Sequence, residues 1–452
     1  MVYYYITSLD YFLTPVVILI VYLFAIAFRN RNYPVGHPWR GYFMTGLTVK
    51  IVGALTIALV YQYYYGGGDT ANYFYHARVI NSAFTDNPLK WISLIFHIPP
   101  WYDGDYSFYI SQMYWYQSPP EYIVCAITAF VSFFTFTTYL PASIIFAALS
   151  FTGIWALFRT FTGLYQLNAR QIAICVLYLP SLILWGSGIF KDTICLGSIG
   201  WMTYGVFRML VLRDFSYKNI IPTIIGFYLI SVIKIYILMA FLPALLLWVL
   251  FNYLHGVGNR VLRFIIRIGV IALSALAFIY VGNKFSDSLG KYSLDNVAQT
   301  SAVTRDWINT VSIESNESSG YTLGDFDPTI AGMLKKLPAA VNVTLFRPYL
   351  WETKKVITLL AALEALAFLL ITIKVVISVG PIRIWRAIAE DPTIQFCLIF
   401  AIIFAFAVGI STYNFGSLSR YRIPCLPFYA FSLILIYYRY NPPEKNLFSL
   451  RL

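Results

Sequence analysis

The sequence predicts an all-α integral membrane protein, a polytopic transmembrane helical bundle of about 11–12 segments that forms one membrane domain over residues 1–452. Hydrophobic residues make up 59% of the chain and charged residues only 12%, and the mean hydropathy is +0.68. So few polar side chains cannot cover a water-soluble surface. The apolar residues also form long unbroken runs, which favour helices in lipid because a helix satisfies its own backbone hydrogen bonds.

The apolar runs divide the chain into predicted membrane segments. These segments are residues 11–28, 42–64, 139–158, 171–188, 193–211, 219–233, 237–253, 263–281, 356–379, 394–411 and 423–438. Strict alternation across the membrane puts the main basic stretches on one side, which the positive-inside rule identifies as cytoplasmic. Those stretches are Arg29–Arg40, Arg159–Arg170, Arg208–Lys218, Arg260–Arg267 and Arg383–Arg386. Residues 121–137 are also apolar, but a full crossing there would reverse every later loop, so we expect a re-entrant or interfacial helix.

Two large extracytoplasmic loops follow from this topology. The first covers residues 65–138, and the second covers residues 282–355. Within the second loop, residues 284–327 are rich in Ser, Asn, Asp and Gly and are a possible lid over a site. Residues 328–351 are more apolar and carry basic side chains, which predicts an interfacial helix.

Composition also excludes some functions. The net charge of +12 comes from Lys and Arg between apolar segments, where they orient the chain in the membrane, so we predict no nucleic-acid partner. The five cysteines lie in or beside apolar runs without a CxxC pair, which is typical of core residues. The four histidines show no zinc-ligand spacing. Carboxylates are also scarce at the predicted outer side, so we predict no cofactor and no obligatory metal, although Asp69 with Asp192 or Glu352 could bind a metal if they converge.

The most distinctive local motif is GGGDTANYFYHA at residues 66–77, where three glycines end a membrane segment on the predicted outer side. If a helix begins at residue 69, then Asp69, Tyr73 and His76 lie on one face of it. Helix capping alone would explain an acidic residue at this position. Capping and chemistry are compatible, so Asp69 is a candidate catalytic acid or base and Tyr73 and His76 are candidate substrate contacts.

Four other outer segment ends carry charged side chains. These residues are Lys191 and Asp192 in GIFKDTI, Lys234 in SVIKIY, Arg347 and Glu352 in FRPYLWE, and Arg420 and Arg422 in SRYRIPC. Capping and interfacial anchoring explain each of them alone. Together they put an excess of cations on the predicted outer side, which an anionic ligand such as a phosphate would explain. A buried Lys234 also needs an acid, a phosphate or water beside it.

This combination fits the transfer of a sugar from a lipid phosphate. A carboxylate can take the proton of an attacking hydroxyl, and cations can stabilise a departing phosphate. Glu364 lies well inside a predicted membrane segment. We interpret it as a buried, protonated side chain that bonds a neighbouring helix.

Several motifs resemble the GT-C superfamily of integral membrane glycosyltransferases, which use polyprenyl-phosphate-linked sugars. GGGDTANYF is similar to the acidic motif in their first large extracytoplasmic loop, PSLILWGSGIFKD is similar to their P-S-x-x-x-W-x-S-G junction, and RYRIPCLPFYA is similar to their late RYRxPxxPF segment. The resemblance implies a catalytic Asp69 and a donor phosphate bound by Arg420 and Arg422. It also implies a bacterial cytoplasmic (inner) membrane location with an extracytoplasmic active face.

The chain departs from the family in two respects. Two segments precede the acidic loop where one is common, and no terminal soluble domain is visible. The acceptor, whether a glycan, a lipid or a protein, would therefore be recognised by the two outer loops.

Two other functions stay open. A polysaccharide polymerase or ligase of the O-antigen type also handles polyprenyl-linked glycans, but such proteins use a late loop with repeated arginines, whereas Arg305 and Arg347 are far apart here. A lipid-linked glycan transporter or flippase would show internal repeats and charged or broken helices at the membrane midplane. The charged groups of this chain lie mostly at the predicted outer ends.

Overall fold

The computed structural model describes residues 5–165, 169–254, 320–324, 329–353 and 355–442, together with residues 265, 269, 303, 447 and 448. Over these residues the chain forms helices and connecting turns and no β-strand. Seven described helices are long and apolar enough to cross a membrane, which confirms a helical membrane protein. They cover Ser8–Asn32, Arg40–Tyr64, Tyr139–Leu164, Lys191–Val211, Ile235–Tyr253, Val356–Val379 and Pro392–Thr412.

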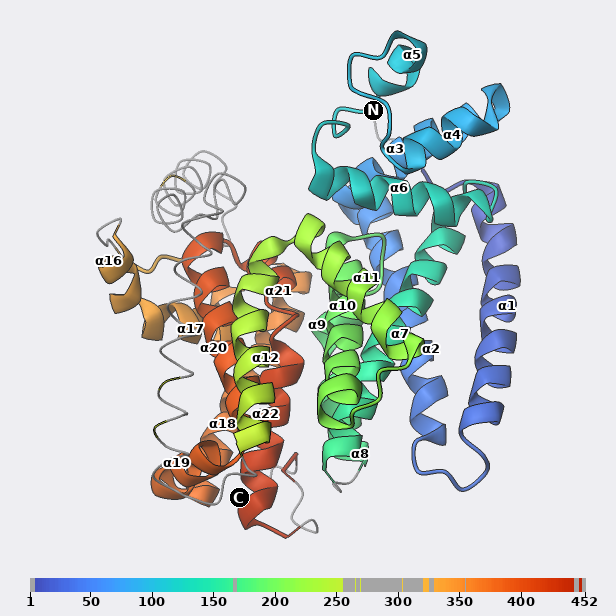
Figure 1. Ribbon diagram of the computed structural model, residues 1–452. Coiled ribbons are helices and arrows are strands. Elements are labelled where there is room, and N and C mark those ends of the chain that lie inside the picture. Colours follow the sequence, from blue (N-terminus) through green and yellow to red (C-terminus); the bar gives the residue numbers. More distant parts are fainter. Residues whose placement is uncertain are drawn as a thin grey trace.

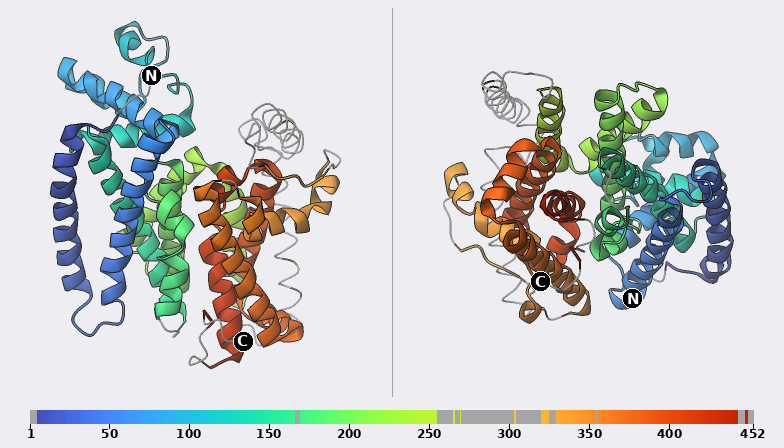
Figure 2. Two further views of the ribbon diagram at one scale, coloured as in Figure 1. Left: turned by 180° about the vertical axis from the view of Figure 1, so that it is seen from behind. Right: turned by 90° about the horizontal axis from the view of Figure 1, so that it is seen from below.

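The helices form two groups that stand side by side (Figures 1 and 2). The first group contains α1 (Ser8–Asn32), α2 (Arg40–Leu59), α3 (Asp69–Asp86), α4 (Pro88–Ile95), α5 (Ser107–Ile110), α6 (Pro119–Phe133), α7 (Tyr139–Leu164), α8 (Ala169–Val176), α9 (Pro180–Trp185), α10 (Lys191–Val206) and α11 (Tyr217–Ile233). The second group contains α12 (Ile235–Leu254), α16 (Ile330–Lys335), α17 (Leu337–Phe346), α18 (Val356–Val379), α19 (Pro381–Glu390), α20 (Pro392–Thr412), α21 (Phe415–Tyr421) and α22 (Leu426–Tyr440).

Short helices cover the two ends of the bundle. Helices α3 to α6 lie at one end, and α6 runs across that end rather than along the bundle (Figure 1). We call it the α3–α6 end. The α1–α2 turn and α19, which carry predicted cytoplasmic arginines, lie at the opposite end, which we call the α19 end (Figure 1). Which end faces the cytoplasm stays a prediction.

Two predicted segments differ from the structure. The run at 171–188 is not one membrane helix but two short helices, α8 and α9, because Pro180 lacks a backbone donor and disfavours a helical residue before it. The expected interfacial helix at 328–351 is likewise divided into α16 and α17. The predicted segment 263–281 and the possible lid at 284–327 lie almost wholly outside the described residues.

Close helix packing in the first group depends on glycines. A Cβ atom on Gly153 of α7 would lie 1.9 Å from the carbonyl oxygen of Gly197 in α10, and one on Gly200 would lie 2.0 Å from that of Gly153. Small residues let two membrane helices approach until their backbones touch. This contact fixes α10, whose first residues, Lys191 and Asp192, are candidate site residues.

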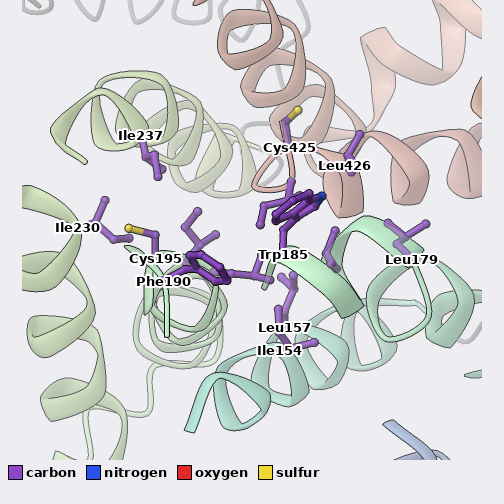
Figure 3. Packing of buried hydrophobic residues seen from close by; sticks show 14 of the residues in the cluster. Ile154, Leu157, Leu179, Trp185, Phe190, Cys195, Ile230, Ile237, Cys425 and Leu426 are labelled. Atoms are coloured by element: carbon purple, nitrogen blue, oxygen red, sulfur yellow. The ribbon is translucent and has the colours of Figure 1, made fainter. Parts of the chain in front are cut away.

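An apolar core joins the two groups. Trp185 of the first group lies close to Cys425 and Leu426 of the second, and Phe190 lies beside Trp185 with the ring centres 6.5 Å apart (Figure 3). All five cysteines are buried and unpaired, which confirms their prediction as core residues. The candidate site lies next to this core, where the starts of α3 and α10 meet α21.

Candidate functional site

Asp69 is the first residue of α3, and the glycines before it explain its position. Gly66, Gly67 and Gly68 all have positive φ angles, of 67°, 149° and 112°, which L side chains rarely adopt. They turn the chain sharply after the π-helical turn that ends α2. The side chain of Asp69 is 48% exposed, so this carboxylate is open to solvent or a ligand at the α3–α6 end.

Arg420 of α21 joins two of the predicted acids. Its Nη1 donates to Asp69 Oδ2 at 2.8 Å, and its Nε donates to Asp192 Oδ2 at 2.6 Å. The guanidinium also lies 4.8 Å from the centre of the Phe190 ring, a cation–π contact. Three predicted site residues from separate parts of the chain are therefore in direct contact.

Lys234 completes this cluster at the junction of α11 and α12. Its ammonium group forms an ion pair with Asp192 Oδ1, and it lies 4.5 Å from the centre of the Tyr421 ring. Asp192 is almost fully buried. Each of its two carboxylate oxygens pairs with one cation, Oδ1 with Lys234 and Oδ2 with Arg420. We call Asp69, Asp192, Lys234 and Arg420 the Asp192 cluster; its formal charge is zero. The sequence analysis expected an acid, a phosphate or water beside Lys234, and the structure places the acid Asp192 there.

Lys191 pairs with a residue that sequence reasoning missed. Its ammonium group binds Glu121, at the start of α6, which also accepts a hydrogen bond from the Ser118 hydroxyl. Burial raises the pKa of Glu121, but Lys191 and Ser118 outweigh it, so the pKa lies below its ordinary value. The Ser-Pro-Pro-Glu sequence at 118–121 is a helix-start signal and could have identified Glu121 as an outer carboxylate.

Arg422 takes a different position from Arg420, although only one residue separates them. Its side chain is 0% exposed. It donates to the carbonyl oxygens of Thr344, Arg347 and Ala361 and forms an ion pair with Glu364 at 3.3 Å. The expected contact of Arg422 with a donor phosphate does not fit this position, because the guanidinium is enclosed by protein.

Glu364 is bonded as the sequence analysis expected, but to a charged partner as well. It accepts from the backbone N–H of Ser181 at 3.0 Å and from the Ser181 hydroxyl at the start of α9. The charged partner is the guanidinium of Arg422, which lies 3.3 Å from the carboxylate. Glu364 therefore connects α18 to α9 and to the turn after α21.

Arg347 and Glu352 pair with each other rather than with the Asp192 cluster. Arg347 Nε lies 3.1 Å from both carboxylate oxygens of Glu352. Glu352 also accepts the Tyr349 N–H, and the Arg347 guanidinium lies 5.3 Å from the Phe415 ring centre. The pair is linked to Arg422 through the Arg347 carbonyl oxygen.

Tyr73 and His76 share a face of α3, but they are buried. The Tyr73 ring centre lies 4.9 Å from that of Trp115, and the His76 ring centre lies 4.5 Å from that of Tyr114. Neither ring nitrogen of His76 has a hydrogen-bond partner among the described residues. Burial lowers the pKa of His76 to about 4, which keeps the imidazole neutral. Neither side chain is in a position to touch a substrate in this structure.

Two buried charged groups outside the site were also missed. Lys50 of α2 donates to the carbonyl oxygens of Leu182, at 3.3 Å, and Gly186 at the end of α9. Asp10 of α1 accepts the N–H groups of Tyr139 and Leu140 at the start of α7, at 2.6 and 2.9 Å. A charged residue inside an apolar run was the available signal for Lys50, as it was for Lys234.

No known protein family, curated protein or solved structure matches this chain. The described residues contain no group of three or more His, Cys, Asp or Glu side chains that could hold a metal ion. What the cluster offers is an accessible carboxylate next to a guanidinium that a second, buried acid holds in place.

Proposed function

We propose that this protein is a GT-C-like glycosyltransferase that moves a sugar from a polyprenyl-phosphate donor to an acceptor hydroxyl at the extracytoplasmic face. The observation that carries the proposal is the contact between Asp69 and Arg420 at the α3–α6 end of the bundle. It pairs a half-exposed carboxylate, suited to act as a base, with a guanidinium, suited to bind phosphate. The motif resemblance and the membrane-protein fold support the same proposal.

The proposed reaction is a single displacement. The acceptor hydroxyl transfers its proton to Asp69 Oδ1, and its oxygen attacks the anomeric carbon of the donor sugar. The bond from that carbon to the phosphate oxygen breaks, and polyprenyl phosphate leaves with the bonding electrons. Oδ1 is available for this role because Arg420 occupies Oδ2 and no other described residue bonds the carboxylate. The product has an inverted anomeric centre.

The cations have unequal roles in this proposal. Arg420 is the first candidate for the leaving phosphate because it contacts Asp69 directly. Asp192 and Lys234 are buried, so Asp192 orients Arg420 and Lys234 balances its charge. Lys191 keeps partial exposure beside Glu121 and is a second candidate for phosphate. Arg422 supports the turn that follows Arg420, and Arg347 and Glu352 support the neighbouring loop.

The test uses the full-length protein purified in detergent with a panel of polyprenyl-phosphate sugars. Binding and sugar transfer or release are measured for the unaltered chain, Asp69→Asn and Arg420→Ala. We expect Asp69→Asn to lower turnover by about 100-fold or more with donor binding retained, since loss of a general base has an effect of this size. Arg420→Ala should weaken donor binding. Asp86→Asn, an exposed acid at the other end of α3, is the matched control.

Each other outcome has a defined meaning. Full turnover by Asp69→Asn would contradict the assignment of the base, and retention of the anomeric configuration would contradict a single displacement. Donor binding without turnover, together with lipid-linked sugar movement across proteoliposomes, would favour a transporter. Turnover confined to lipid-linked oligosaccharides would favour a polymerase or ligase.

A further inference from the structure

Helix α19 has three distinct faces. One face is turned inward: Ala387 is buried, and Ile384 and Ile388 pack against the core. With about 100° between successive helical residues, Ile382 and Trp385 fall together on a second face. These two side chains are 78% and 73% exposed, so the protein itself leaves them uncovered.

The third face of α19 is basic. Arg383 and Arg386 lie one helical turn apart, and both are exposed. The described residues offer neither arginine an ion-pair partner; Arg383 contacts only the ring of Tyr440, at 5.9 Å. The nearby acid Glu390 is already paired with Arg439. Among the described residues, both guanidinium groups are therefore without an acidic partner and can bind an anion.

The position of α19 identifies what covers the apolar face. The helix lies across the α19 end of the bundle, directly after α18 (Figure 1). Val376 and Ile377, near the end of α18 and a few residues before α19 in the chain, are also exposed apolar side chains. A membrane-crossing helix with such residues faces acyl chains, so the adjoining face of α19 lies at the edge of the same lipid layer.

We propose that α19 is a binding site for an anionic phospholipid. Ile382 and Trp385 lie among the ends of the acyl chains, and Arg383 and Arg386 hold the phosphate of the headgroup. Basic side chains beside an interfacial apolar face attract acidic lipids in this way. The arginine stretch in α19 is also predicted to be cytoplasmic, where anionic lipids are common. This inference is independent of the proposed glycosyltransferase activity.

Native mass spectrometry of the full-length protein, re-lipidated with equal amounts of phosphatidylglycerol and phosphatidylcholine, tests the site. We expect phosphatidylglycerol to be the more tightly retained lipid. Arg383→Gln/Arg386→Gln should weaken its binding roughly 30-fold, as expected for two arginines near a lipid surface. Arg29→Gln/Arg31→Gln, two arginines at the same end of the bundle in α1, should leave it unchanged.

A second variant tests the apolar face. Ile382→Ser/Trp385→Ser should reduce retention of both lipids at this site, while the thermal unfolding midpoint stays unchanged because the side chains are exposed. Equal phosphatidylglycerol binding by the unaltered protein and the α19 arginine variant would overturn the proposal. An equal loss of phosphatidylglycerol binding in Arg29→Gln/Arg31→Gln would also overturn it, since that result indicates unspecific charge attraction. Conversion of a dimer to a monomer by Ile382→Ser/Trp385→Ser, with lipid binding unaltered, would instead identify a second copy as the occupant and overturn it as well.

Discussion

Arg420 Nη1 lies 2.8 Å from Asp69 Oδ2, a contact between residues 351 positions apart that joins the start of α3 to α21. The same guanidinium reaches Asp192 at the start of α10. Arg420 therefore links the second group of helices to the first residues of α3 and α10 in the first group. Its removal should affect stability as well as activity.

Arg420→Gln should destabilise the protein. Asp192 is buried and would lose one of its two cations, and removing one member of a buried ion pair typically costs about 3 kcal/mol. Thermal unfolding in detergent measures the change. Lys90→Gln breaks an exposed pair with Asp86 and should leave the midpoint nearly unchanged. Equal effects of the two substitutions would show that Arg420 is not a structural link.

Glu364 and Arg422 should be strongly coupled. Glu364→Leu leaves a fully buried guanidinium with carbonyl partners only, and we expect a loss of about 3–5 kcal/mol in unfolding free energy. Arg422→Leu should be similarly harmful. The double substitution to leucine should recover much of the loss because no charge is left buried. A double-mutant cycle on unfolding midpoints measures the coupling, and strict additivity would contradict the pairing.

His76 should make the protein less stable in acid. Its pKa is lowered to about 4 by burial, whereas an unfolded histidine has a pKa near 6.5. Between these values the unfolded state binds more protons than the native state, so stability falls as the pH drops from about 6.5 to about 4. The expected loss is roughly 2 kcal/mol at pH 4.5 relative to pH 7.

His76→Phe isolates this contribution, since an aromatic ring is kept between Tyr114 and Trp115. Unfolding midpoints of both proteins are compared at pH 7 and pH 4.5. The unaltered protein should lose more stability than His76→Phe over this range. Parallel pH profiles would mean that His76 already binds a proton in the folded state.

Gly153→Ala should disrupt the contact of α7 with α10. The new Cβ atom would lie 1.9 Å from the Gly197 carbonyl oxygen, so the two backbones must separate. We expect this to lower the free energy of unfolding by about 1–3 kcal/mol. Gly163→Ala in the same helix is the matched control, because its nearest atom would be Phe207 at 3.6 Å. A lower unfolding midpoint for Gly153→Ala alone is expected. Equal midpoints would show that α7 and α10 can move apart freely.

Much of the secondary structure could be predicted because membrane helices leave a strong local signal. The predicted segment 356–379 coincides with α18, and the predicted segment 42–64 ends with the π-helical turn after α2. The break at Pro180 was overlooked, although proline offers a clear physical reason for it. The candidate residues at outer segment ends were also found, because a charge beside an apolar run is visible in the sequence itself.

The pairing of those charges could not be predicted from local patterns. Arg420 and Arg422 occur in one short motif, yet one reaches a half-exposed acid while the other is buried against Glu364. Their side chains leave the helix end in different directions, and what each meets depends on helices far away in the chain. Glu121 became a partner of Lys191 for the same reason.

Apolar runs alone therefore specify a helical membrane protein, because lipid offers the backbone no hydrogen-bond partners and leaves the helix as the stable form of each run. Packing of the helices in three dimensions sets which charges are neutralised, since a buried ion is stable only beside an opposite charge or several hydrogen bonds. Asp69, Asp192, Lys234 and Arg420 meet only because α3, α10, α12 and α21 come together at one end of the bundle.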